Sequence, residues 1–247
     1  AETAVQKHHP EFSIQKLDYD DPETYKMLGQ GDTEGVFQLE SSGMKQVLVG
    51  LQPQNLEDVI ALISLYRPGP MDSIPTYLRN RHEPDKISYK TPQLAHILDV
   101  TNGCIVYQEQ VMQIFRELAG FSFGQADNVR RAMSKKKHAV MEAEREHFVH
   151  GCTEPGHECP GCVANGISEK VANEIYDEMS SFASYAFNKS HAACYAYVAF
   201  QTAYLKCHYP SEFMAALLTS VLDNTDKVIE YSGECARLGI KVLPPDV

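Results

Sequence analysis

Residues 107–120 read YQEQVMQIFRELAG and carry the clearest structural pattern in the chain. Four apolar residues in this segment recur three and four positions apart: Val111, Ile114, Phe115 and Leu118. This spacing places side chains on one face of an α-helix. Gly120 follows where such a helix would end, and glycine favours the left-handed conformation of a helix C-cap. The segment therefore predicts an amphipathic helix that packs its apolar face against a core.

Helix signals continue on both sides of this segment. Asn55 is a good N-cap for a helix over 56–65, and the sequence RPGP at 67–70 ends that helix. An earlier short helix starts at Asp21-Pro22 and ends by Gly31. Further helices are expected at 125–134, 138–150, 170–182, 190–208, 211–222 and 225–238. The sequence at 35–39 fits a single strand or a helix start, and 76–81 fits one helical turn. Strand signals are scarce, so the sequence predicts an all-α fold.

Two segments interrupt this helical pattern. Residues 1–17 are polar and are expected to form an extended or poorly ordered lead-in. We expect 18–247 to form one helical region, in which the Cys/Gly/Pro-rich stretch 151–166 is a loop between two helices.

The composition fits a globular protein and bounds what it binds. The chain has 247 residues, 43% of them hydrophobic, which allows a sizeable core without disulfides. No apolar stretch approaches the roughly 20 residues that cross a bilayer, so no membrane partner is expected. The start, AETA, lacks the features of a signal peptide and an initiator Met, which processing or a cut from a longer chain would explain. A net charge of −11 disfavours a protein that coats nucleic acid, but it allows a local basic site.

The seven cysteines indicate a reducing compartment. They are Cys104, Cys152, Cys159, Cys162, Cys194, Cys207 and Cys235. Because the count is odd and no secretion signal is visible, we expect reduced thiols in a cytoplasm rather than a disulfide framework.

A basic run at 130–137, RRAMSKKK, is the strongest candidate binding site. It places five positive charges in eight residues with no acid between them. The charged residues are Arg130, Arg131, Lys135, Lys136 and Lys137. Arginine binds phosphate through a bidentate fork and lysine supplies a point charge, so the run suits a chain of phosphates. The alternative is a solvated helix face. Since the rest of the chain is acidic, we favour phosphate binding.

A second candidate is the segment FNKSHAACY at 187–195. Asn188, His191 and Tyr195 lie three and four positions apart, so they share one face near a helix N-terminus, where anions are favoured. Lys189 and His191 add donors, and Tyr195 suits stacking on a base or sugar. The alternative is N-capping by Asn188 or Ser190 at the start of a packing helix.

The loop 151–166 contains a potential metal site. Cys152, His157, Cys159 and Cys162 supply three thiolates and one imidazole within eleven residues, the donor set of a structural zinc site. His147 or His150 are alternatives to His157. A redox-active CxxC pair or inert thiols are the other possibilities.

A fourth motif, GFSFG at 120–124, matches the G-x-S-x-G pattern of α/β-hydrolases. That motif requires a serine on a strand-to-helix turn above a parallel sheet. Here the motif follows a helix, so Gly120 is expected to be a C-cap, and Phe121 and Phe123 are expected in the core. The polar clusters at 37–41 and 107–110 fit either functional contacts or helix capping.

These motifs together resemble one family, the alpha subunit of bacterial DNA polymerase III, a C-family replicative polymerase. The matching segments are VFQLES (36–41), RPGP (67–70), YQEQVM (107–112), RRAM (130–133), KKK (135–137), FNKSH (187–191), YPSEFMAA (209–216) and LPPDV (243–247). They follow the family's order over about 18–247. The resemblance implies a largely helical fingers region that contacts template-primer DNA and the incoming deoxynucleoside triphosphate (dNTP). It implies these contacts for the basic run and for the 188–195 cluster, with the rest of the alpha subunit and other replisome subunits as partners.

Two departures from the family limit this prediction. Phosphoryl transfer needs acidic residues that hold two metal ions, and the family's palm motif of alternating aspartates is absent. Asp18, Asp20 and Asp21 follow a polar segment unlike the family's strand and are not assigned as ligands. We therefore expect the fragment to be inactive alone, and magnesium to be bound only by the full-length enzyme with its palm. The cysteine-rich loop is not a general family feature, so its zinc rests on spacing. The alternative function is a non-enzymatic, zinc-stabilised helical module that binds nucleic acid or an acidic protein.

Overall fold

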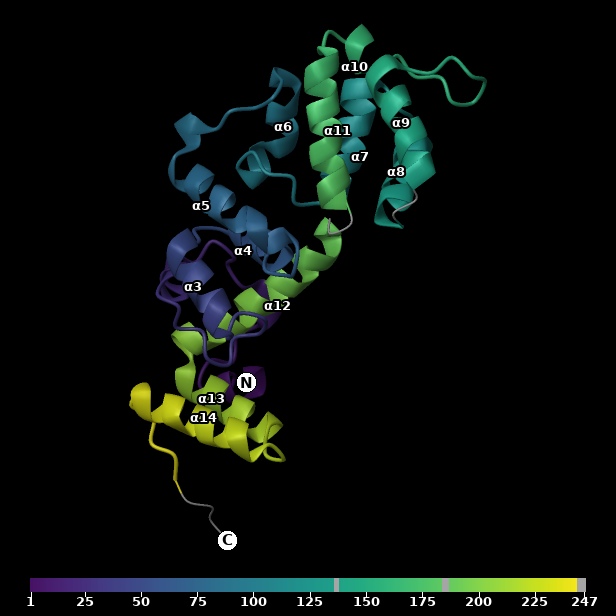
Figure 1. Ribbon diagram of the computed structural model, residues 1–247. Helices are drawn as coiled ribbons and strands as arrows, with labels where there is room; N and C mark the ends of the chain where they lie inside the picture. Colours follow the sequence, from purple (N-terminus) through teal and green to yellow (C-terminus); the bar gives the residue numbers. More distant parts are fainter. Residues whose placement is uncertain (136–137, 184–186, 244–247) are drawn as a thin grey trace. The chain divides into compact units, whose positions relative to one another are not determined.

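The computed structural model describes residues 1–135, 138–183 and 187–243, and these ranges are mainly helical (Figure 1). Within them, β-structure is limited to two isolated bridges, which pair Tyr107 with Phe187 and Cys152 with Cys159. The predicted all-α fold is therefore confirmed. None of the described helices combines the length and the apolar character needed to cross a bilayer.

The chain divides into two compact units. Unit 1 comprises residues 1–63 and 193–247, and unit 2 comprises residues 64–192. Both boundaries fall inside helices, α4 (Leu56–Leu65) and α12 (Lys189–His208).

Unit 1 is built from helices at both ends of the sequence. Besides most of α4 and α12, it contains α1 (Glu2–Val5), the 3-10 turn η1 (Ile14–Lys16), α2 (Pro22–Gly29), α3 (Ser42–Leu51), α13 (Pro210–Ser220) and α14 (Thr225–Arg237). Helix α13 packs against α14 and α1, and α2 packs against α3. One of its hydrophobic clusters consists of Val5, Phe12, Leu205, Phe213, Met214, Tyr231 and Cys235.

The first residues differ from the expected extended lead-in. Residues 1–17 contain α1 and η1, and they bury Val5 and Phe12 in the unit 1 core. Ser13 caps η1 by accepting a hydrogen bond from the Gln15 amide. The sequence did not reveal this packing because two isolated apolar residues in a polar context produce no periodicity.

Unit 2 is centred on α7 (Gln108–Ala119). Its other long helices are α8 (Phe123–Ser134), α9 (His138–His150) and α11 (Glu169–Ala183), and these pack with α7 as a bundle (Figure 1). The short elements are η2 (Pro70–Ser73), α5 (Ile74–His82), η3 (Pro84–Lys86), η4 (Pro92–Leu94), α6 (Ala95–Leu98), η5 (Asp99–Thr101) and α10 (Gly161–Ala164).

The apolar stripe predicted for α7 forms the centre of the unit 2 core. Val111, Ile114, Phe115 and Leu118 are all fully buried. The Phe115 ring lies 5.0 Å from the ring of Phe148 on α9 and 6.0 Å from the ring of Tyr176 on α11. Gly120 ends α7 in the left-handed conformation, with φ of 75°, as predicted.

Two short segments differ from their predicted structure. Residues 35–39 form neither a strand nor a helix start but a series of turns, in which the Thr33 hydroxyl donates to the Leu39 carbonyl at 2.6 Å. The single turn expected at 76–81 is a longer helix, α5, because Pro75 occupies its first turn, where no amide donor is needed.

Candidate functional site

The basic run begins in the last turn of α8. Arg130 and Arg131 are helical, and Lys135 is the C-cap residue of α8. Lys136 and Lys137, which complete the predicted run, lie outside the described residues. The structure therefore places three of the five predicted cations at the end of one helix.

Arg130 donates hydrogen bonds from all three of its side-chain nitrogen atoms. Its Nε and Nη2 donate to the Asp127 Oδ1 atom at 3.0 and 2.8 Å, and its Nη1 donates to the Gln108 Oε1 atom at 3.0 Å. The side chain is 21% exposed. These contacts fix the guanidinium between α7 and α8, with part of its surface open to solvent.

Arg131 points to a different hollow. Its Nη2 lies 2.7 Å from the Asp127 Oδ2 atom, and 64% of its side chain is exposed. Arg131 and Lys135 line a hollow of about 240 Å³ together with Asn128. The hydrogen bond from Arg130 is the main cause that lowers the pKa of Asp127, so its carboxylate is ionised at neutral pH. The Asp127 carboxylate thus pairs with both arginines, although Arg130 and Arg131 line different hollows.

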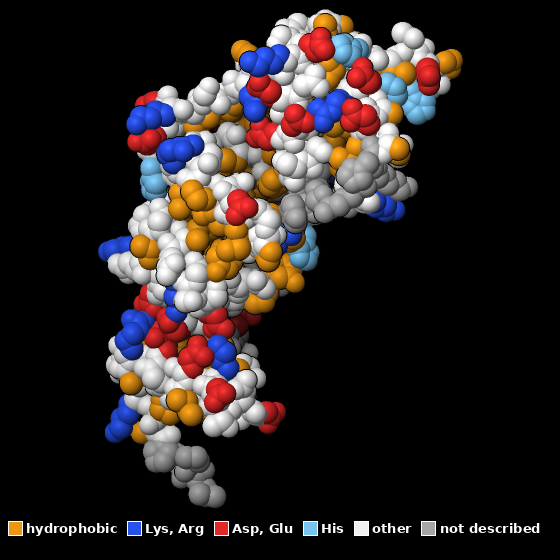
Figure 2. Space-filling model, viewed as in Figure 1, with side chains coloured by type: hydrophobic (Ala, Val, Ile, Leu, Met, Phe, Trp, Pro, Cys, Tyr) orange, Lys and Arg blue, Asp and Glu red, His pale blue; other side chains and the backbone are white. Residues whose placement is uncertain are grey.

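Arg130 opens into a cleft of about 510 Å³ on the surface of unit 2. The cleft is lined by Gln108, Glu109, Met112, Gln113, Arg116, Glu117, Phe123, Asp127, Arg130 and Asn188. Two of these residues are basic and three are acidic. Figure 2 likewise shows acidic and basic side chains interspersed on the visible face rather than one continuous basic patch. The cleft is thus a local site with defined polar groups.

The start of α12 is tied to α7 beside this cleft. The Asn188 Oδ1 atom accepts a hydrogen bond from the His191 amide at 2.9 Å, so the predicted capping role of Asn188 is confirmed. Its Nδ2 donates to the Glu109 Oε1 atom at 3.0 Å, and the Lys189 amide donates to the same carboxylate at 3.2 Å. The Lys189 ammonium lies 5.3 Å from the centre of the Tyr107 ring. The polar clusters at 107–110 and 187–191 therefore meet in space.

Two members of the predicted 188–195 group make other contacts. The His191 ring packs edge-on against Phe187, with ring centres 5.3 Å apart. Tyr195 belongs to unit 1, where its ring lies 5.4 Å from that of Phe37. Of this group, Asn188 is the residue that lines the cleft with Arg130.

Arg116 and Phe123 are cleft residues that the sequence did not single out. Phe123 was predicted in the core, but 65% of it is exposed, whereas Phe121 is buried as predicted. The Arg116 guanidinium lies 5.9 Å from the Phe123 ring centre. Arg116 lies seven residues after Glu109 and four after Met112, so all three share one face of α7. This helical spacing could have indicated Arg116 as a cleft residue.

Ser122 has a structural role. Its Oγ atom accepts from the Gln125 amide at 3.3 Å, and the Gln125 side chain accepts from the Ser122 amide at 2.7 Å, which forms a capping box at the start of α8. No parallel sheet occurs in the described ranges, so the hydrolase interpretation has no structural support.

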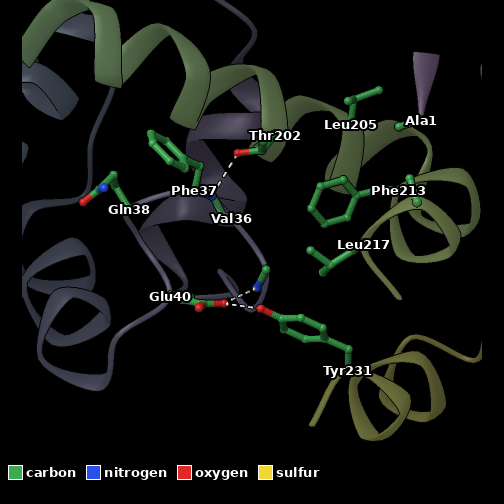
Figure 3. A pocket seen from close by; sticks show the side chains of 12 residues that line it. Ala1, Val36, Phe37, Gln38, Glu40, Thr202, Leu205, Phe213, Leu217 and Tyr231 are labelled. Atoms are coloured by element: carbon green, nitrogen blue, oxygen red, sulfur yellow. Dashed lines mark hydrogen bonds between the residues drawn. The ribbon is translucent and has the colours of Figure 1, made fainter. Parts of the chain in front are cut away.

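The segment at 36–41 anchors helices within unit 1. Figure 3 shows Phe37, Glu40 and Tyr231 around a pocket of about 410 Å³ with an apolar side formed by Leu205, Phe213 and Leu217. The Glu40 carboxylate accepts from the Gly35 amide at 3.0 Å and from the Tyr231 hydroxyl at 2.9 Å. Ser41 caps α3 through the Met44 amide.

The predicted metal ligands lie between α9 and α10. Cys152 and Cys159 are paired main chain to main chain, Cys162 lies in α10 and is fully buried, and His157 is exposed. Burial raises the pKa of the Cys162 thiol to about 12 and also raises that of Cys159. The ligand atoms of no three of these residues lie within 4.8 Å of one another.

One set of three carboxylates within the described ranges meets that distance, but a lysine already occupies it. Asp32, Glu34 and Glu234 lie in unit 1. The Lys206 ammonium is 3.0 Å from the Asp32 Oδ1 atom and 2.7 Å from the Glu234 Oε1 atom. This set is therefore a buried ion-pair network.

The chain matches the family model described as the bacterial DNA polymerase III alpha subunit finger domain, over residues 1–156. The chain belongs to this family. It is similar to two proteins named DNA polymerase III subunit alpha. One, from Thermus aquaticus, is 50% identical over 242 residues. The other, from Staphylococcus aureus strain Mu50, is 44% identical over 236 residues. Each match covers 96% of this chain but only 19% and 21% of the relatives, so the chain spans about a fifth of their length.

Proposed function

We propose that the chain acts as the fingers part of a replicative DNA polymerase, and that the cleft between α7 and α8 binds the phosphates of an incoming dNTP. The observation that carries this proposal is the placement of Arg130. Arg130 belongs to the basic run, and Gln108 and Asn188 belong to two other matching motifs. All three residues line the same cleft. Family membership supplies the reaction class, and the cleft supplies a site for its substrate.

The chemistry of Arg130 suits a phosphate. A guanidinium forms parallel hydrogen bonds to two oxygen atoms, and Gln108 and Asp127 already fix its plane. A group held in place before binding loses little side-chain entropy when the ligand arrives. Arg116, which also lines the cleft, adds a second cation beside the exposed Phe123 ring, which offers a stacking surface for a base.

The carboxylates of the cleft do not prevent anion binding. Glu109 is bound to the start of α12, and Asp127 is bound to the two arginines. Glu117 accepts hydrogen bonds from Gln113 and is paired with His96. Each acid thus has a protein partner, so the cost of bringing a phosphate near it is reduced.

The second surface, formed by Arg131 and Lys135, suits template-primer DNA. These side chains are exposed on the other side of α8 and flank a shallow hollow. Exposed cations bind the DNA backbone without reading its sequence. We propose that the same helix contacts the nucleotide through Arg130 and the DNA backbone through Arg131.

Catalysis requires more than these residues. The described ranges contain no free group of three acidic ligands, since the one close set encloses Lys206. We propose that the magnesium-binding residues belong to the remaining four fifths of an alpha subunit, and that the 247-residue chain does not polymerise alone. The free cysteines fit the reducing cytoplasm in which such a polymerase would work.

The test is a titration of each dNTP against the wild-type chain and the Arg130→Ala variant. Loss of a charge-assisted hydrogen bond of about 1.5–3 kcal/mol predicts roughly 10- to 100-fold weaker binding. Arg145→Ala is the matched control, because Arg145 is equally half-buried but binds Asp177 away from the cleft. In a full-length subunit, the Arg130 variant should raise KM for dNTP. Equal affinity of the wild type and Arg130→Ala in both assays would reject the assignment.

A further inference from the structure

The loop between α9 and α10 is a short hairpin. Cys152 and Cys159 donate to and accept from each other's main chain at 2.9 Å, and the His157 amide donates to the Glu154 carbonyl at 2.9 Å, which closes a tight turn. Figure 1 shows this hairpin extending away from the ends of the two helices. The stretch therefore has a defined register that fixes which side chains share a face.

This register groups the candidate ligands. In a hairpin, directly opposed residues project to the same face, and so do residues two apart on one strand. Cys152 opposes Cys159, and His157 is two residues before Cys159, so strand alternation would place all three on one face. Glu158 belongs to the other face, where its carboxylate accepts from the Gly156 amide at 2.9 Å.

The turn after Cys159 returns the chain to the base of the hairpin. Gly161 has φ of 78°, and a Cβ atom there would lie 2.3 Å from the Gly151 amide nitrogen. This close approach requires glycine. Cys162 follows three residues after Cys159 and belongs to the same unit 2 core cluster. Gly151, Pro160 and Gly161 thus form a compact turn at the CPGC sequence, residues 159–162.

The hairpin tip lacks apolar anchors. Residues 153–158 are all exposed, and a two-stranded hairpin by itself is marginally stable in water. A bound ion would supply the missing cross-link between the tip, its base and α10. Structural zinc sites take such sets of thiolates and imidazole, with four ligands and no open position.

We propose that Cys152, His157, Cys159 and Cys162 bind one zinc-class divalent ion, a site separate from the α7–α8 cleft. Their ligand atoms are spread in this structure, so binding requires rotation of these side chains and release of the thiol protons. His147, whose carbonyl lies 3.6 Å from the Cys159 sulfur, is the competing fourth ligand.

The first experiment measures zinc by elemental analysis in the purified chain, and the absorption of the cobalt-substituted form. We expect about one ion per chain and a tetrahedral thiolate spectrum in the wild type. The Cys159→Ser/Cys162→Ser variant should lose both, while the exposed Cys194→Ser control should keep both. If the double variant fails to fold, the half-buried Cys152→Ser tests the same site without opening the core. A metal-free wild type, or mass-spectrometric detection of a Cys159–Cys162 disulfide in it, overturns the proposal.

The fourth ligand is assigned by a pair of histidine variants. His157→Ala should change the cobalt spectrum and weaken zinc binding at least tenfold, whereas His147→Ala should leave both unchanged. The reverse result overturns the assignment of His157. Nucleotide affinity of Cys152→Ser should stay at the wild-type value, so a failure of the metal proposal is distinguishable from a failure of the cleft proposal.

Discussion

Asp127 accepts two hydrogen bonds from Arg130, at 3.0 Å from Nε and 2.8 Å from Nη2, and so occupies one edge of the guanidinium. Its other oxygen pairs with Arg131 at 2.7 Å. The carboxylate therefore competes with an anionic ligand for both arginines while it orients them.

Replacing Asp127 with Asn should raise the affinity of the chain for dNTP and for inorganic pyrophosphate. The amide keeps a hydrogen-bond acceptor for Arg130 but removes the competing charge. For an ion pair near the surface this predicts a gain of about two- to fivefold. Calorimetric titration measures it, and Asp177→Asn, which alters the partner of Arg145, is the control. Weaker binding by Asp127→Asn would show that orientation of Arg130 outweighs competition.

The two faces of α8 should differ in their effect on DNA binding. The Arg131→Ala/Lys135→Ala double variant should lose about two phosphate contacts. The slope of log Kd against log salt concentration should therefore fall by about two. Fluorescence anisotropy with a primer-template duplex measures this slope. Arg130→Ala and the exposed control Lys170→Ala should leave it near the wild-type value. An equal change in all three variants would remove the distinction between the faces.

The helices were predictable because their signals are local. The stripe of α7, the glycine that ends it and the Asn188 cap of α12 each depend on neighbours within four positions. The packing of Val5 and Phe12 was not predictable, because their partners in α13 and α14 lie about 200 residues away in the sequence. Apolar periodicity depends on neighbours in the sequence and carries no information on such contacts.

The candidate site was predictable in its parts but not in its grouping. The sequence indicated Arg130 and Asn188 as binding residues, and the structure places them around one cleft. The sequence also grouped Arg130 with Arg131, but these two arginines line different hollows. Adjacent helical residues lie about 100° apart around the helix axis, so neighbours in a charged run can face different surfaces.

Glu109 should stabilise the start of α12. Its carboxylate accepts from the Lys189 amide and from Asn188, so it combines a cap with a favourable charge at a helix N-terminus. Glu109→Ala should lower the protection of the first α12 amides by about 1 kcal/mol. Hydrogen exchange measures this, with Glu178→Ala as the control, since Glu178 pairs with Lys90 instead. Unchanged protection in Glu109→Ala would show that packing alone orders this end of α12.

Lys206 should be the most stabilising single charge in unit 1, because its side chain is 1% exposed and lies between Asp32 and Glu234. Lys206→Met leaves buried carboxylates with fewer partners, and this predicts a loss of about 3–5 kcal/mol in the free energy of unfolding at pH 7. Lys227→Met is the control, since Lys227 is 32% exposed and its surface pairs contribute less than about 1 kcal/mol.

The loss caused by Lys206→Met should also depend on pH in a definite direction. Hydrogen bonds from Arg237 and then Lys206 hold the pKa of Glu234 below its usual range. A lowered carboxyl pKa contributes stability above the unfolded value, about 4.3, and that stability is lost as pH falls through the folded value. Urea unfolding from pH 7 to pH 3 should therefore show wild type and variant converging below about pH 4. A gap that stays constant to pH 3 would mean that the ionisation of Glu234 does not account for the loss.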